Sequence, residues 1–116
     1  MSSHDRMVRL RHMLDHAREA VSLVQDKTRA DLDSDRLLNL GLVRLLEIVG
    51  EAASQISREE CALYPQIPWP QIVSMRNRLI HGYDTVDFDI LWQILTCDLP
   101  PLIADLETIL ASERIE

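Results

Sequence analysis

The feature that most constrains this chain is the spacing of its apolar residues, which recur every three or four positions over long stretches. From Asp5 to about Lys27 they form one stripe, made by Met7, Leu10, Leu14, Ala17, Val21 and Val24. Such a stripe is typical of an α-helix with one buried face. A second, wider stripe from Asp35 to about Ser57 covers about half of the helix circumference, which predicts a central helix packed on several neighbours. In the polar connection between the two helices, Asp33 or Ser34 is suited to cap the second helix.

The rest of the chain continues this helical pattern. A short helical turn in "SREEC" precedes three prolines around Trp69, and Pro70 is suited to the first turn of a third helix that runs to about His81. Gly82 then predicts a left-handed stop. A fourth helical region starts near Asp87 and is ended or kinked at Pro100. We therefore expect one all-α domain over residues 1–116, an up-down bundle of four to five helices with the last one kinked at Pro100.

Composition limits the function classes. The net charge of −7 argues against nucleic-acid binding through a broad basic surface, so any RNA or DNA contact must be local. Cys61 and Cys97 lack the spacing and the histidine neighbours of a zinc or redox site, and we expect two reduced, partly buried thiols and no metal or cofactor.

No segment is apolar and long enough to cross a membrane. We expect a cytoplasmic protein.

The stretch "RNRLIHGYDTVD", residues 76–87, concentrates polar side chains at the end of the third helix. On a helical wheel Arg76 falls inside the apolar arc, whereas Arg78 points elsewhere and is expected to be a surface charge. A buried arginine is costly unless it is paired or opens onto a cleft. Asn77 and His81 lie at the edge of the same arc. Tyr83, just past the expected stop, is expected to be half-buried with its hydroxyl in water.

Two interpretations of this segment stay open from the residues alone. In the structural one, Arg76 pairs with Glu47 or Glu51 of the second helix and His81 sits favourably at a helix C-terminus. In the catalytic one, Arg76 and His81 act on a phosphodiester, with histidine as general acid or base and arginine stabilising charge. On one ideal helix the two side chains diverge by about 140°. They converge only if the helix loosens near Gly82 or if a two-fold dimer brings a second copy of the segment.

The segment resembles a known family. "RNRLIHGY" fits the R-x4-H-x-Y signature of the HepT-like family of HEPN domains, and "LLEIVGEAASQIS" and "VDFDILWQILTCDLPPLIADL" are also similar to it. The resemblance implies an all-α bundle that forms a two-fold dimer with the signature residues in the cleft between the copies. It also implies a metal-independent endoribonuclease that is the toxin of a toxin–antitoxin pair. Arg76 and His81 would then be catalytic and Asn77 supporting. Glu47 and Glu51 are expected as further supporting residues because they are the acids of the second helix that can reach Arg76, and the resemblance does not imply this role.

The family resemblance further implies a partner and a switch. The partner would be a minimal nucleotidyltransferase antitoxin that attaches AMP to Tyr83 and so silences the nuclease, adding bulk and negative charge near His81. The alternative is a non-catalytic HEPN module that docks to a nucleotidyltransferase or presents substrate to it. A purely structural helical domain without any site is the third reading.

Overall fold

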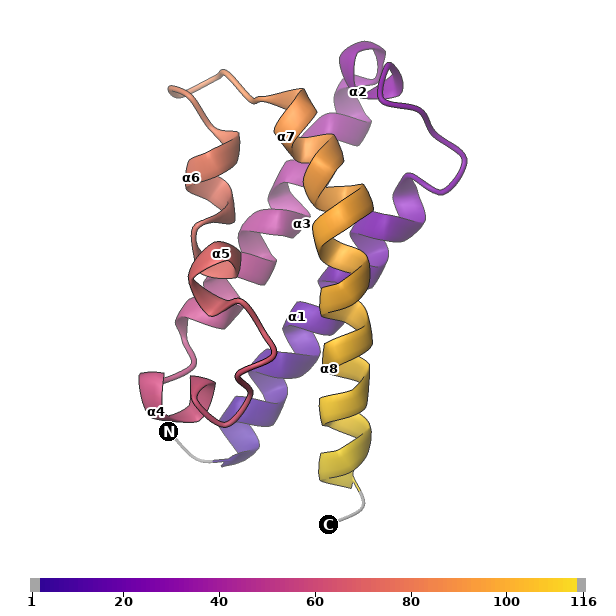
Figure 1. Cartoon of the computed structure of the whole chain (residues 1–116). Helices are drawn as coiled ribbons and strands as arrows, with labels where there is room; N and C mark the ends of the chain where they lie inside the picture. The colour runs from indigo at the N-terminus through magenta and orange to yellow at the C-terminus, as the bar shows by residue number, and fades with distance from the viewer. Residues whose placement is uncertain (1–2, 115–116) are drawn as a thin grey trace.

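The computed structural model describes residues 3–114. Residues 1, 2, 115 and 116, which the expected domain range includes, lie outside the described part. The chain folds into an up-down bundle of four helical segments, each of which we call a leg (Figure 1). The first leg is α1 (Ser3–Leu23) and the second is α3 (Arg36–Ser54), with the short α2 (Asp31–Ser34) between them. The expected all-α architecture is confirmed.

The third leg is made of two short helices rather than one. After the turn of α4 (Arg58–Cys61), α5 spans Trp69–Val73 and α6 spans Met75–Leu79, with Ser74 between them in a non-helical conformation. Pro70 occupies the first turn of α5, as predicted. The prediction of one helix reaching His81 was wrong, because the chain turns into an extended conformation at Ile80.

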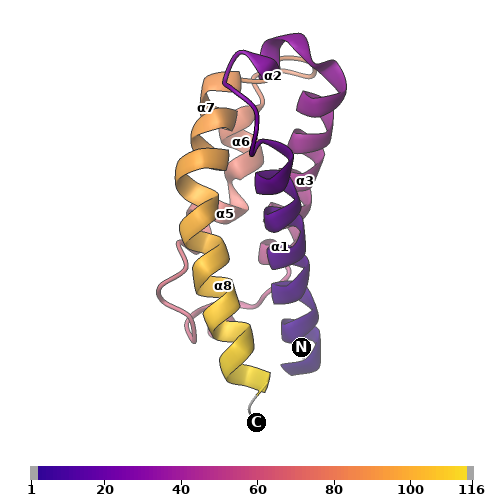
Figure 2. The same cartoon turned by 90° about the vertical axis from the view of Figure 1, so that its right-hand side faces the viewer.

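The fourth leg is a continuous helical run with an irregular middle (Figure 2). It begins with α7 (Phe88–Gln93), passes through the π-helical segment η1 (Ile94–Asp98) and ends with α8 (Leu99–Arg114). In η1 the Leu99 N–H bonds to the Ile94 carbonyl, one residue further back than in an α-helix. The irregularity expected at Pro100 therefore lies just before it, because Pro100 and Pro101 have no N–H to continue the regular pattern.

The core lies between α1 and the helices α3 and α8 that pack on it, and it extends to α7. Its fully buried side chains are mainly leucine, isoleucine and methionine, such as Leu10, Leu14, Leu46, Leu91 and Leu106. The central position predicted for α3 is confirmed, since this helix packs against α1, α2, α5 and α6. Within residues 3–114, none of the helices is both long and apolar enough to cross a bilayer.

Several local expectations need correction. The cap of α3 is Asp35, whose side chain accepts a hydrogen bond from the Leu38 N–H, and not Asp33 or Ser34. Those two residues belong to α2 instead. Cys61 is partly buried, as expected, but Cys97 is exposed, and both thiols are free. Burial raises the pKa of the Cys61 thiol, which therefore stays protonated at neutral pH.

Candidate active site

The polar segment 76–87 begins in α6 and continues as the loop of residues 80–87 that joins α6 to α7 at one end of the bundle (Figure 1). Ile80 pairs with Val86 in an isolated antiparallel bridge. The His81 N–H donates to the Thr85 carbonyl over 2.8 Å, and the Asp87 N–H donates to the Leu79 carbonyl over 2.8 Å. These bonds hold His81 and Tyr83 on a tight loop instead of on a helix.

Gly82 has a left-handed backbone, but it lies in the loop after the third leg and not directly at the end of a helix. Its φ is +107°, a value that side-chain-bearing residues rarely adopt. The prediction that Gly82 stops the third helix was wrong, since the helix ends at Leu79 and Gly82 forms the turn of the loop. The loosening near Gly82 that Arg76 and His81 need in order to converge is thus present. The helical conformation ends at Leu79, two residues before His81.

Arg76 is exposed rather than buried. Its side chain is 58% exposed, and its Nε atom donates a hydrogen bond of 2.9 Å to Oε2 of Glu47 on α3. The wheel placed Arg76 inside the apolar arc because it assumed one ideal helix, whereas Ser74 interrupts the third leg. Val73, the last residue of α5, is 44% exposed as well. The ion pair with Glu47 agrees with one alternative that the sequence left open.

Glu51 does not contact Arg76. Among the described residues, Glu47 is the carboxylate that pairs with Arg76, and Glu51 forms no ion pair. Glu47, Glu51, Arg76 and Asn77 nevertheless line one hollow of about 140 Å³ between α3 and the α5–α6 leg. Asn77 is exposed there, so its amide is available to a ligand.

Arg78, predicted to be a surface charge, is partly buried and holds the third leg to the fourth. Its Nη2 atom lies 3.3 Å from Oδ2 of Asp98, the last residue of η1. Its Nε atom is buried and has no hydrogen-bond partner. Sequence reasoning missed this contact because Asp98 follows Arg78 by twenty positions and faces it only through the packing of two legs.

His81 is paired with a carboxylate that the sequence did not indicate as a site residue. Its Nε2 atom lies 3.6 Å from Oδ2 of Asp87, and its side chain is 54% exposed. Asp87 also caps α7 by accepting a hydrogen bond from the Ile90 N–H. That hydrogen bond is the main reason why the pKa of Asp87 lies below its ordinary value, and His81 lowers it further. The only available signal was the position of Asp87 directly before a helix.

Tyr83 is fully exposed, which corrects the expectation of a half-buried packing residue. It borders a second hollow of about 250 Å³ between the loop and α3, which Leu40, Val43 and Glu47 also line. The chain's other tyrosine, Tyr64, is buried, and its hydroxyl donates to Glu113. The side chain of Tyr83 is therefore open to solvent, whereas that of Tyr64 is buried and bonded to Glu113.

Within residues 3–114, the hydrogen bonds and ion pairs join Arg76 to Glu47 and His81 to Asp87, and none joins Arg76 to His81. Each candidate is therefore oriented by its own carboxylate. The described part of the chain contains no group of three histidine, cysteine or acidic side chains arranged to hold a metal ion. What the segment offers is a guanidinium, an amide, an imidazole and a phenol, which together suit a phosphodiester.

Comparison with known proteins identifies the family. A family model described as ribonuclease HepT-like matches residues 13–109. The chain belongs to the HepT-like ribonuclease family. The R-x4-H-x-Y segment lies within the matched range, so the resemblance inferred from the sequence is confirmed. The RNA-cleaving class of enzyme is confirmed at the level of the family.

Individual relatives agree with this assignment. The chain is 37% identical over 93 residues to a protein of Thermococcus cleftensis named "Probable ribonuclease HepT", covering 77% of this chain and 84% of the relative. It is 31% identical over 105 residues to a "Putative RNase" of Caldanaerobacter subterraneus, covering 90% and 94%. A "Putative RNase" of Methanocaldococcus jannaschii is 29% identical over 109 residues, covering 94% and 100%. No solved structure matches the chain.

Proposed function

We propose that this HepT-like protein is a metal-independent endoribonuclease that acts as the toxin of a toxin–antitoxin pair. The observation that carries the proposal is the joint exposure of Arg76, Asn77, His81 and Tyr83 on one short segment of a chain in a ribonuclease family. These side chains contribute little to the core of the bundle. Their exposure on one segment is what a site that receives an external substrate requires.

The proposed reaction uses the 2′-hydroxyl of the RNA as the nucleophile. This oxygen attacks the adjacent phosphorus, and the bond to the 5′-oxygen of the next nucleotide breaks. His81 moves the proton as general base or acid. Arg76 stabilises the charge on the phosphorane, and Asn77 holds a phosphate oxygen. The products carry a 2′,3′-cyclic phosphate and a 5′-hydroxyl, and the reaction calls for no metal ligand.

The proposal extends to a two-fold dimer. Leu37, Leu40 and Tyr83 are exposed, at 83%, 49% and 100%, and Leu40 borders the same hollow as Tyr83. Exposed leucines next to a site favour a contact with another protein surface. Pairing across this face would place two copies of the segment close together, which would supply the second histidine that an acid–base pair uses.

The test is cleavage of labelled RNA by the purified chain, expressed without any nucleotidyltransferase and assayed with a chelator. We expect cleavage of RNA but not of RNA with 2′-O-methyl groups, and products with cyclic phosphate ends. Arg76→Ala and His81→Ala should each lower the rate by about 10² to 10⁴-fold. Arg58→Ala is the matched control, because Arg58 is an exposed arginine on α4. Unmodified wild-type protein that cleaves no RNA would sink the proposal.

The proposed switch is AMP transfer to Tyr83 by a cognate nucleotidyltransferase antitoxin. The phenolic oxygen would attack the α-phosphate of ATP and release pyrophosphate. Intact mass after co-expression should rise by one or more adenylyl groups in the wild type and in Tyr64→Phe, but not in Tyr83→Phe. A mass shift that persists in Tyr83→Phe would contradict Tyr83 as the acceptor.

The second candidate function is a non-catalytic module that docks to a nucleotidyltransferase. The ion pair of Arg76 with Glu47 favours it, because this is how a structural surface arginine is often held. In that case the chain would co-purify with the nucleotidyltransferase. The wild type would not cleave RNA, so Arg76→Ala and His81→Ala would cause no change in the cleavage assay. The cleavage assay with the unmodified chain separates the two functions.

A further inference from the structure

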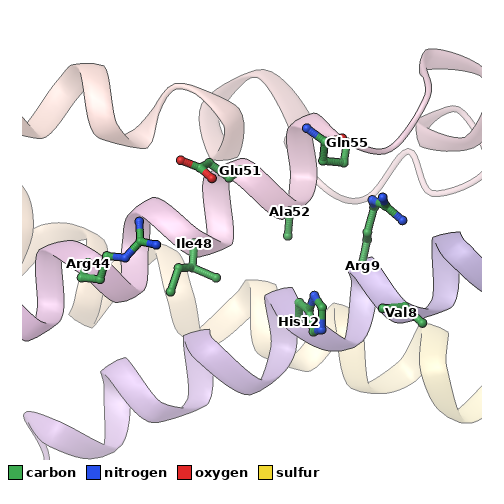
Figure 3. A pocket seen from close by; sticks show the side chains of 8 residues that line it. All are labelled: Val8, Arg9, His12, Arg44, Ile48, Glu51, Ala52 and Gln55. Atoms are coloured by element: carbon green, nitrogen blue, oxygen red, sulfur yellow. The ribbon is translucent and has the colours of Figure 1, made fainter.

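A hollow of about 470 Å³ lies between α1 and α3, on the other side of α3 from Arg76. Arg9 and His12 line it from α1, and Arg44, Ile48 and Gln55 line it from α3. Figure 3 shows the Arg9 side chain rising from α1 toward α3, with His12 one turn further along the same helix. Two elements thus present cationic and hydrogen-bonding groups to the same space.

The two arginines of this hollow are not neutralised by carboxylates. Among the described residues, the arginines that form ion pairs are Arg6, Arg18, Arg29, Arg76 and Arg78. Within residues 3–114, Arg9 donates a hydrogen bond to the main-chain oxygen of Asp5, and neither Arg9 nor Arg44 is among the arginines that form ion pairs. In a chain with a net charge of −7, two guanidinium groups without an ion-pair partner in the described part of the chain outnumber the one carboxylate, Glu51, that lines the same hollow, so the hollow carries a local positive charge.

The hollow adjoins the candidate active site. Glu51 lines both this space and the smaller hollow that contains Arg76 and Asn77. The two therefore share α3 as a common wall, and an extended ligand bound at Arg76 reaches the α1–α3 hollow by crossing that helix. Figure 3 shows the carboxylate of Glu51 pointing away from α1, so it borders the crossing without filling the hollow.

We propose that the hollow between α1 and α3 binds the phosphodiester backbone of the RNA strand at a distance from the bond that is cleaved. The inference rests on the proposed ribonuclease function and assigns Arg9 and Arg44, at opposite ends of the hollow in Figure 3, as the groups that each hold one flanking phosphate. Guanidinium forks match phosphate oxygens in pairs, and the Gln55 amide and a His12 N–H add neutral donors. Ile48 gives the hollow an apolar surface against which a ribose packs.

The proposal explains how an acidic protein holds RNA. Cations on both sides of α3 give the strand two attachment points, while Glu51 at the crossing opposes binding. Removal of the positive charges in the hollow and removal of the negative charge at Glu51 therefore change the affinity for RNA in opposite directions. Arg9→Gln and Arg44→Gln weaken binding, and Glu51→Gln strengthens it.

The test measures binding of a fluorescein-labelled single-stranded RNA by anisotropy at several KCl concentrations, in a His81→Ala background that prevents cleavage. Arg9→Gln/Arg44→Gln should lower the affinity roughly tenfold per arginine, the usual worth of a charge-assisted hydrogen bond. It should also reduce the salt slope by about 1.4, which is two phosphate contacts on a single strand. In the cleaving protein the same pair should raise KM and leave kcat unchanged.

The matched control is Lys27→Gln/Arg58→Gln, which removes the same charge from exposed positions away from the hollow. It should keep the salt slope of the parent. Arg9→Lys/Arg44→Lys keeps the charge but loses the planar fork, so it should keep the slope and lose affinity. Circular dichroism and light scattering on each variant verify fold and assembly state.

Three outcomes overturn the inference. The first is an Arg9/Arg44 variant that binds RNA like the matched control. The second is a change of assembly state in that variant, which would make the hollow a contact between copies of the chain. The third is a Glu51→Gln variant that binds more weakly. Wild-type protein that binds RNA with the expected slopes but never cleaves it would refute the proposed function and leave the phosphate site standing.

Discussion

At the scale of single residues, the contact between Arg76 and Glu47 has a particular geometry. Glu47 accepts from the Nε atom of Arg76 over 2.9 Å, which leaves the two terminal nitrogens of the guanidinium to a ligand. A carboxylate at Nε therefore orients the group without occupying the nitrogens that grip a phosphate. Glu47 acts in this interpretation as a positioning residue for Arg76.

Substitution of Glu47 separates orientation from charge. Glu47→Gln keeps an oxygen that accepts from Nε, so we expect a kcat close to the wild type and a lower KM, because a negative charge beside the substrate is gone. Glu47→Ala removes the acceptor as well and should lower kcat. Both variants should lose less than about 1 kcal/mol of stability, since the Arg76 side chain is more than half exposed. Steady-state cleavage kinetics measure the split, and an equal kcat in both variants would contradict the positioning role.

Asp87 links the site loop to α7 and makes a pH prediction. Its pKa lies below the ordinary value of 3.8, first because it accepts the Ile90 N–H and further because of His81. A carboxyl with a depressed folded-state pKa contributes stability that is complete above its unfolded pKa and is lost as the pH falls through the folded value. Wild-type protein should therefore lose stability relative to Asp87→Asn as the pH drops below about 4. Urea unfolding of both across the acid range measures this, and parallel curves throughout would refute it.

At the scale of elements, the two glycines of α3 have opposite roles. A methyl group on Gly50 would lie 3.2 Å from the Ile72 carbonyl oxygen of α5, whereas one on Gly41 would meet nothing within 4 Å. Of these two glycines, Gly50 is thus the one at which a neighbouring backbone approaches closely. It lets α5 dock against α3 and so sets the position of the leg that carries Arg76.

Alanine at the two glycine positions should therefore have different effects on stability. Gly41→Ala should stabilise the protein by about 1 kcal/mol through helix propensity alone. Gly50→Ala gains the same propensity but must displace backbone, so it should be less stable than Gly41→Ala by about 1–3 kcal/mol. Chemical denaturation monitored by circular dichroism gives both values. Equal effects at the two sites would contradict the close α3–α5 contact, because the added methyl group at Gly50 would then fit without moving the α5 backbone.

The elements also show where sequence reasoning reached its limit. Periodicity located the bundle and the start of the fourth leg at Asp87, because local apolar spacing and capping determine those features. It could not foresee the break at Ser74 or the exit of His81 from the helix. These depend on the bridge between Ile80 and Val86 and on packing of the third leg against α3, which are tertiary interactions.

The residues of the candidate site stay a prediction, whereas the geometry that the helical wheel gave them was wrong. The family signature indicated Arg76, Asn77, His81 and Tyr83 regardless of how the backbone carries them. The helical wheel then gave the wrong environment for both arginines, because it treated a broken helix as ideal. Arg76 is the exposed one and Arg78 the partly buried one, held by Asp98 across the bundle.

At the scale of the whole molecule, a dimer over the exposed leucines makes a direct prediction about mass. Wild-type protein should scatter light as twice the chain mass of 13.3 kDa. Leu37→Glu/Leu40→Glu should return it to a single chain and abolish cleavage while the helix content stays, because both side chains are exposed and outside the core. Leu63→Glu is the control, since Leu63 is 58% exposed just after α4. A monomeric wild type that still cleaves RNA would contradict the dimer.

Mixing two inactive variants tests whether one site draws on two chains. In an Arg76→Ala chain paired with a His81→Ala chain, one of the two equivalent sites retains Arg76 from one copy and His81 from the other. If catalysis uses Arg76 and His81 from different copies, exchange of subunits should restore up to about a quarter of wild-type activity, because half of the dimers are mixed and each has one of two sites intact. If both act from the same chain, the mixture stays as inactive as its components. Cleavage assayed before and after exchange in mild denaturant distinguishes the two arrangements, and no recovery despite mixed dimers detected by native mass spectrometry would rule out the shared site.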